Sequence, residues 1–134
     1  IIYPDIYEHQ SFAIDNIGLF SGNTSYFIPT ADIWLCGLFN SQTVEWFYSN
    51  VSNKVRGGYL RAFTDYMKQI PIPVTTSVER IHIEEILDRI LTFKRADPHA
   101  DVSALEAKID RLVYQLYGLT EAEIALVEGR SAKA

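Results

Sequence analysis

Two stripes of apolar residues in the second half of the chain constrain its fold more than any other feature. Both stripes repeat at intervals of three and four residues, which places their members on one face of an α-helix. The first consists of Ile83, Ile86, Leu87, Ile90 and Leu91, and the second of Val102, Leu105, Ile109, Leu112, Val113 and Leu116. Asp97-Pro98 lies between them and ends the first stripe, because proline cannot continue a helix. The pattern predicts an antiparallel helical hairpin over residues 77–117.

A third, short helix is predicted directly after this hairpin. Gly118 stands where helices commonly end in a left-handed glycine. Thr120 and Glu123 have the spacing of a capping box, in which each side chain bonds the backbone N–H of the other residue. These signals predict a helix at Glu121–Val127, and we expect residues 129–134 to form a frayed tail.

The first half of the chain has the pattern of short β-strands instead. Runs rich in β-branched and aromatic residues occur at 1–3, 11–15 and 26–28, and Ser21-Gly22-Asn23 marks a turn before the last run. We therefore predict an α+β fold. A small β-rich lobe occupies residues 1–75, and the helical hairpin and third helix occupy residues 76–128.

A buried helical segment is predicted inside this lobe. Residues 33–48 are largely apolar, and Thr30 or Asp32 is the expected N-cap. Gly37 and the Asn40-Ser41 pair weaken the middle of the segment. The pattern therefore allows either one helix or two helices with a bend.

Charge is distributed unevenly along an acidic chain. The formal net charge of the 134 residues is −5, which by itself argues against a nucleic acid partner. Residues 1–50 contain five acidic residues and no lysine or arginine, and residues 76–134 carry a net charge of −3. Residues 51–75 carry a net charge of +3. This compact basic segment favours contact with phosphate.

Residues 52–61 combine cations with adjacent glycines and an aromatic side chain. The glycines let the backbone approach a ligand closely, the cations suit phosphate oxygens or guanine edges, and an asparagine can read adenine. The candidate contact residues are Arg56, Lys54, Arg61, Gly57, Gly58, Tyr59 and Asn53, with Asn23 and Thr24 in a second polar loop that could lie beside the first. The alternative is an ordinary turn in which Arg56 pairs with an acid such as Asp65.

No active site is predicted in this sequence. The histidines His9, His82 and His99 stand far apart in unlike contexts, and no metal-ligand spacing occurs. Cys36 lies in an apolar run, where we expect a buried thiol. A single cysteine cannot form an internal disulfide, and no apolar run approaches the length of a membrane span. We therefore expect a cytoplasmic protein without metal or membrane partner.

Several segments in order carry a family resemblance. They are Asn23-Thr24-Ser25-Tyr26-Phe27-Ile28-Pro29, then Leu38-Phe39-Asn40-Ser41 with Glu45-Trp46-Phe47, then Lys54-Val55-Arg56-Gly57-Gly58-Tyr59-Leu60-Arg61 leading into Tyr66 and Ile70-Pro71-Ile72-Pro73, and finally the ending from Ile109-Asp110 to Thr120-Glu121. Together they resemble the TaqI-like C-terminal specificity domain. That domain occurs in adenine-specific DNA methyltransferases and type IIG restriction enzymes.

This resemblance implies a role in DNA target recognition. In that family the specificity domain lies against the major groove of duplex DNA, while a separate upstream domain binds S-adenosylmethionine and methylates adenine. The Asn-Pro-Pro-Tyr type of motif expected in that catalytic domain does not occur in this chain, so the resemblance implies no cofactor and no catalytic residue here. We expect the chain to be part of a longer site-specific adenine methyltransferase, with or without a fused endonuclease.

The acidic helices need a different role, because their charge repels phosphate. We expect them to brace the recognition lobe against the methyltransferase domain, or to associate with a second copy of the chain. The competing interpretation is a protein–protein interaction module that binds no DNA. In that case the basic segment is incidental.

Overall fold

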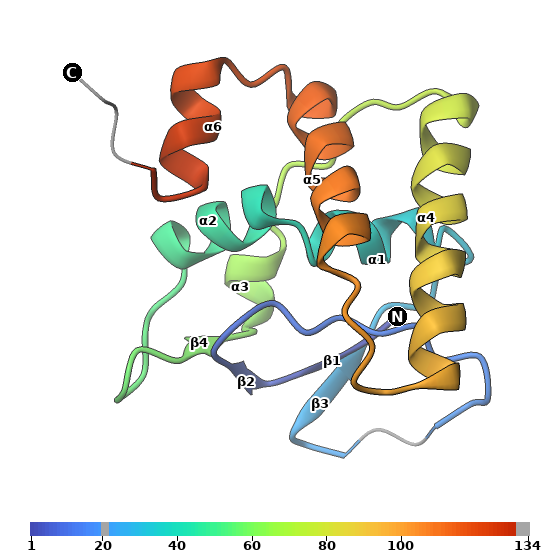
Figure 1. Ribbon diagram of the computed structural model, residues 1–134. Coiled ribbons are helices and arrows are strands. Elements are labelled where there is room, and N and C mark those ends of the chain that lie inside the picture. The colour runs from blue at the N-terminus through green and yellow to red at the C-terminus, as the bar shows by residue number, and fades with distance from the viewer. Residues whose placement is uncertain (20–21, 131–134) are drawn as a thin grey trace.

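The computed structural model describes residues 1–19 and 22–130 and has the α+β fold predicted from the sequence. Ser21 of the predicted turn and residues 131–134 of the predicted tail lie outside the described residues. In chain order the elements are β1 (Ile2–Pro4), β2 (Ile6–Tyr7), β3 (Ser25–Phe27), α1 (Trp34–Phe39), α2 (Gln42–Val51), β4 (Leu60–Arg61), α3 (Thr64–Met67), α4 (Ser77–Ala96), α5 (Ser103–Tyr117) and α6 (Glu121–Val127). Figure 1 shows the strands below α1, α2 and α3, at the level of the lower half of α4.

The strands form two small antiparallel pairs that meet at Asp5. β1 pairs with β3, and β2 pairs with β4. The chain bends at Asp5. The N–H of Asp5 donates to the Thr24 carbonyl at 3.0 Å, and its carbonyl accepts from the Ala62 N–H at 2.8 Å. One residue thus ties together the segments that enter β3 and leave β4.

The predicted strand at residues 11–15 forms only a single bridge, between Ile2 and Ala13. The side chain of Asn40 accounts for this difference. Its Oδ1 accepts from the Phe12 N–H at 2.8 Å, and its Nδ2 donates to the Phe12 carbonyl at 2.7 Å. A side chain from the end of α1 therefore takes the backbone groups that a neighbouring strand would have bonded.

The predicted buried segment is two helices with a break at Asn40-Ser41, one of the two forms that the sequence allows. The Oγ of Ser41 accepts from the Val44 N–H at 3.3 Å and so caps α2. The expectation that Thr30 or Asp32 caps α1 is wrong, because the N-cap is Ile33 and makes no side-chain cap bond. The Thr30 hydroxyl instead accepts from the Asp32 N–H at 3.0 Å, within the preceding loop.

The long helices α4 and α5 pack against each other, and Figure 1 shows them side by side with the chain reversing between them. Gly118 ends α5 with a φ of +64°, and Thr120 and Glu123 form the capping box of α6, both as predicted. A second capping box, between Thr76 and Glu79, opens α4. The spacing of these two residues could have predicted it.

The two predicted parts of the chain share one hydrophobic core. Ile83 of α4 and Val113 of α5 are fully buried in it, together with Val44 and Tyr48 of α2. A polar contact adds to this packing. The carboxylate of Asp110 accepts from the Gln42 N–H at 2.9 Å and from its Nε2 at 2.8 Å. Because Gln42 begins α2, the helix dipole favours this negative charge, and α5 is held to the lobe that carries the basic segment.

Candidate nucleic-acid interface

The basic segment forms a tight hairpin between α2 and β4. The N–H of Gly58 donates to the Val55 carbonyl at 3.0 Å, and the N–H of Val55 donates to the Tyr59 carbonyl at 2.9 Å. Gly57 and Gly58 have φ angles of +92° and +84°, which residues other than glycine rarely adopt. The glycines are therefore required for the turn. We call residues 54–59 the basic hairpin.

Arg56 lies at the turn of the basic hairpin, with its side chain exposed. Within the described ranges it has no hydrogen-bonding or ion-pair partner. The acid considered as its alternative partner, Asp65, is paired with Lys68 at 2.7 Å. In Figure 1 the hairpin projects away from the helices at the lower left. The Arg56 guanidinium is therefore available to an external anion.

Three further candidates are exposed on the same hairpin or beside it. Asn53, Lys54 and Tyr59 all present their side chains to solvent, and 43% of Tyr59 is exposed. Lys54 also lines a polar cleft of about 270 Å³ between the hairpin and α2. The structure thus brings most of the predicted contact residues to one exposed turn.

Arg61 differs from the other cationic candidates, because it already has partners inside the protein. Its Nη2 lies 3.3 Å from an Asp5 carboxylate oxygen, and its guanidinium carbon lies 4.4 Å from the centre of the Phe63 ring. Only 29% of its side chain is exposed. Asp5 balances much of its charge, so Arg61 is a weaker candidate for phosphate than Arg56.

The second polar loop is linked through Asp5 to the end of β4, the strand that follows the basic hairpin. Asn23 and Thr24 are exposed in a turn that leads into β3. The Thr24 carbonyl bonds the N–H of Asp5, and the carbonyl of Asp5 bonds Ala62, the residue after β4. These contacts connect the second loop to the end of β4 through one residue.

The polar cleft beside the hairpin is lined by two acidic side chains, Glu8 and Glu45. The Nδ1 of His9 lies 3.1 Å from a carboxylate oxygen of Glu45, and this hydrogen bond raises the pKa of His9. The other oxygen of Glu45 accepts from the Gln10 N–H at 2.9 Å. Because carboxylates repel phosphate, the turn of the hairpin suits DNA better than the cleft does.

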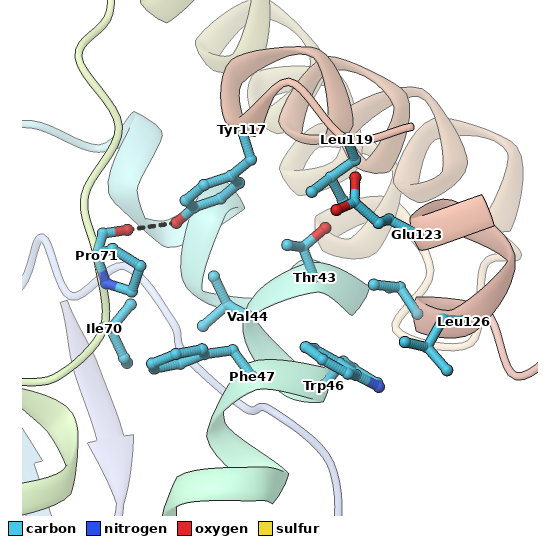
Figure 2. A pocket seen from close by; sticks show the side chains of 11 residues that line it. Thr43, Val44, Trp46, Phe47, Ile70, Pro71, Tyr117, Leu119, Glu123 and Leu126 are labelled. Atoms are coloured by element: carbon cyan, nitrogen blue, oxygen red, sulfur yellow. Dashed lines mark hydrogen bonds between the residues drawn. The ribbon is translucent and has the colours of Figure 1, made fainter. Parts of the chain in front are cut away.

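A second surface feature is an apolar groove of about 300 Å³ between α2, α6 and the segment after α3 (Figure 2). It is lined by Thr43, Val44, Trp46, Phe47, Ile70, Pro71, Tyr117, Leu119, Glu123, Leu126 and Val127. The Tyr117 hydroxyl donates to the Pro71 carbonyl at 2.5 Å, the dashed contact in Figure 2, and burial raises the pKa of Tyr117 to about 12. No local sequence pattern indicates this groove, because its walls come from three separate segments.

The part of the chain that the structure describes offers no metal centre. Among these residues no group of three or more histidine, cysteine or acidic side chains could hold a metal ion. Cys36 is a buried free thiol, as expected, and burial raises its pKa to about 11, which keeps it protonated and unreactive. No helix within the described ranges is both long and apolar enough to cross a membrane.

Comparison with known proteins identifies the class of domain. The family model of the TaqI-like C-terminal specificity domain matches residues 1–72, which is more than half of the chain. The chain belongs to this family, as its resemblance predicted. The matched region includes both the basic hairpin and the loop with Asn23 and Thr24.

Two curated relatives are type II methyltransferases. M.XhoI of Xanthomonas vasicola is 28% identical over 131 residues, which cover 95% of this chain and 22% of the relative. M.PaeR7I of Pseudomonas aeruginosa is 28% identical over 133 residues, which cover 96% of this chain and 21% of the relative. The chain thus spans about a fifth of the length of these curated relatives. No solved structure matches it.

Proposed function

We propose that this chain is a target-recognition domain that binds duplex DNA through the basic hairpin and positions a methyltransferase domain on it. The observation that carries the proposal is the position of Arg56. It is an exposed arginine without an internal partner among the described residues, at a glycine-dependent turn within the region that matches a specificity domain.

The chemistry of the hairpin supports a division of roles. Arg56 suits a bidentate contact to a guanine edge, whereas Lys54 suits phosphate as a point charge. Gly57 and Gly58 let the backbone approach the groove, and Tyr59 can pack against sugar or base. Asn53, Asn23 and Thr24 supply additional polar contacts. Phosphate contacts fix the register of the protein on DNA, and base contacts select the sequence.

The catalytic step belongs to a separate domain in this proposal. That domain binds S-adenosylmethionine and methylates adenine, in a type II or type IIG enzyme of the bacterial type that acts in the cytoplasm. The target adenine must leave the base stack, which costs a few kcal/mol. Binding by the recognition domain offsets this cost only at the correct sequence. The names of both curated relatives, type II methyltransferases, support the proposal.

The apolar groove supports a second contact, with the methyltransferase domain. Trp46 and Leu126 are 37% and 59% exposed there, and exposed apolar patches mark protein contacts. Both relatives are several times longer than the region that matches this chain, so a large neighbouring domain is available in them. A second copy of this chain is the alternative occupant of the groove.

Replacing Arg56 with alanine is expected to weaken DNA binding without affecting folding. If the side chain reads a guanine, the complete enzyme loses roughly 1–3 kcal/mol of affinity for its target sequence. If it contacts only phosphate, affinity falls similarly for all sequences. The slope of the logarithm of the association constant against the logarithm of salt concentration then becomes shallower by about one, because one counterion fewer is released. Binding to labelled duplexes and thermal melting are measured on the same variant.

The matched control is Arg111→Ala, which removes an exposed arginine from the acidic helical part of the chain. It changes the net charge by the same amount, so equal losses in the two variants would reveal only a general charge effect. An Arg56→Ala protein that melts early but still binds DNA normally at low temperature would assign Arg56 a structural role and refute recognition by this residue.

A further inference from the structure

Residues 59–63 alternate between exposed and buried positions. Leu60 and Ala62 are 3% and 2% exposed and face the core, whereas Tyr59 and Phe63 are 43% and 41% exposed. Arg61 lies between them on the outer side, because side chains alternate along an extended segment. We call Tyr59, Arg61 and Phe63 the stacking face.

Internal contacts hold two members of the stacking face, Arg61 and Phe63, in place. The Arg61 guanidinium lies over the Phe63 ring at 4.4 Å, and Asp5 binds the guanidinium at 3.3 Å. The Phe63 ring lies 6.1 Å from the ring of Tyr66. Arg61 and Phe63 are therefore ordered before a partner arrives, which lowers the entropic cost of binding.

The core does not account for this face. Its aromatic rings leave two-fifths of their surface in solvent, although an aromatic ring gains most when it is fully buried. The face begins at Tyr59, the last residue of the basic hairpin, and lies in the segment of residues 51–75 with a net charge of +3. Exposed rings combined with cations recognise unpaired bases, because the rings stack on the base and the cations contact phosphate. In a continuous duplex, neighbouring base pairs cover the faces of each base.

We propose that the stacking face binds an unpaired base in DNA, next to the site that the basic hairpin contacts. The proposal rests on the proposed function, and it adds a preference for DNA in which one nucleotide has left the stack. A domain with this preference would stabilise the opened DNA on which a base-modifying enzyme acts.

The test compares a short labelled duplex with the same duplex carrying a single unpaired adenine. Binding of the 134-residue chain is measured by fluorescence anisotropy at low salt. We expect the duplex with the unpaired base to bind roughly fivefold more tightly or better. Phe63→Leu should abolish this preference and leave the affinity for the continuous duplex unchanged. The matched control, Phe93→Leu, alters a phenylalanine that is 50% exposed on α4 and should keep the preference.

The outcomes separate this inference from the proposed function. Equal affinity for the two probes, with binding that still depends on Arg56, would overturn the stacking face and leave duplex recognition intact. A lack of binding to both probes would overturn both. If Phe63→Leu lowers the melting temperature, Tyr59→Leu is measured instead. Because Tyr59 also lies on the basic hairpin, this variant can bind both probes less tightly, and only the ratio of the two affinities is compared; we expect that ratio to fall to about one. If the Tyr59→Leu variant and a folded Phe63→Leu variant both still prefer the duplex with the unpaired base, the assignment is also refuted.

Discussion

Replacing Val113 with aspartate is expected to lower the free energy of unfolding by about 3–5 kcal/mol. Val113 is fully buried on α5, within the core that α5 shares with the lobe. A carboxylate at this position must either lose its water or take up a proton, and both are unfavourable in an apolar site. Urea unfolding followed by circular dichroism measures the loss.

The apolar stripe alone predicts a loss of several kcal/mol for the neighbouring Leu112→Asp as well, but the partial burial of Leu112 makes this variant the matched control. Both residues belong to the second apolar stripe, but Leu112 is only partly buried. It lines a surface depression in which Arg89, Lys108 and Arg111 outnumber the single acid, Glu85. A carboxylate at Leu112 keeps contact with water and meets positive charges, so a clearly smaller loss is expected. Equal losses at the two positions would contradict the packing of α5 described above.

Replacing Gly37 with valine is expected to destabilise the protein by about 3 kcal/mol through overpacking. A Cβ atom at Gly37 would lie 2.8 Å from Cγ2 of Ile83, 3.5 Å from Cδ1 of Leu87 and 3.6 Å from Cγ2 of Ile109. The first distance is too short for two carbon atoms that are not bonded to each other, and all three neighbouring residues are buried. The gain from removing a glycine inside a helix, about 1 kcal/mol or less, is too small to compensate.

Gly37→Ala separates these two effects, because alanine improves the helix most and adds only the Cβ atom. Its loss should be smaller than that of the valine variant, since Ile83 need move only slightly. Thermal melting of both variants and of the unmodified chain ranks the three proteins by stability. A valine variant as stable as the unmodified chain would mean that α1 does not approach α4 this closely.

The helical half could be predicted from the sequence because its signals are local. The capping box of Thr120 and Glu123 and the glycine at Gly118 lie within a few residues of the helix ends that they define, and α6 has the predicted bounds. The strand pairs are not local. β1 pairs with β3, and β2 with β4, across long stretches of chain in which no short pattern specifies the partner.

In the candidate site, too, the local features could be predicted from the sequence and the contacts between distant residues could not. Lys54, Arg56 and the two glycines could be found from their composition and order alone. The contacts of Arg61 with Asp5 could not, because Asp5 lies 56 residues earlier in the chain. In the sequence Gly37 indicates only a weak point in a helix, whereas the structure shows that its missing side chain permits a close helix crossing. The apolar groove likewise required the folded arrangement.

The most direct test of the central claim is the salt dependence of binding between the unmodified chain and duplex DNA. If Lys54 and Arg56 each displace a counterion from phosphate, the logarithm of the association constant should fall linearly with the logarithm of salt concentration, with a slope of about −2 or steeper. No binding at low salt, or binding that salt leaves unchanged, would contradict DNA recognition by the basic hairpin.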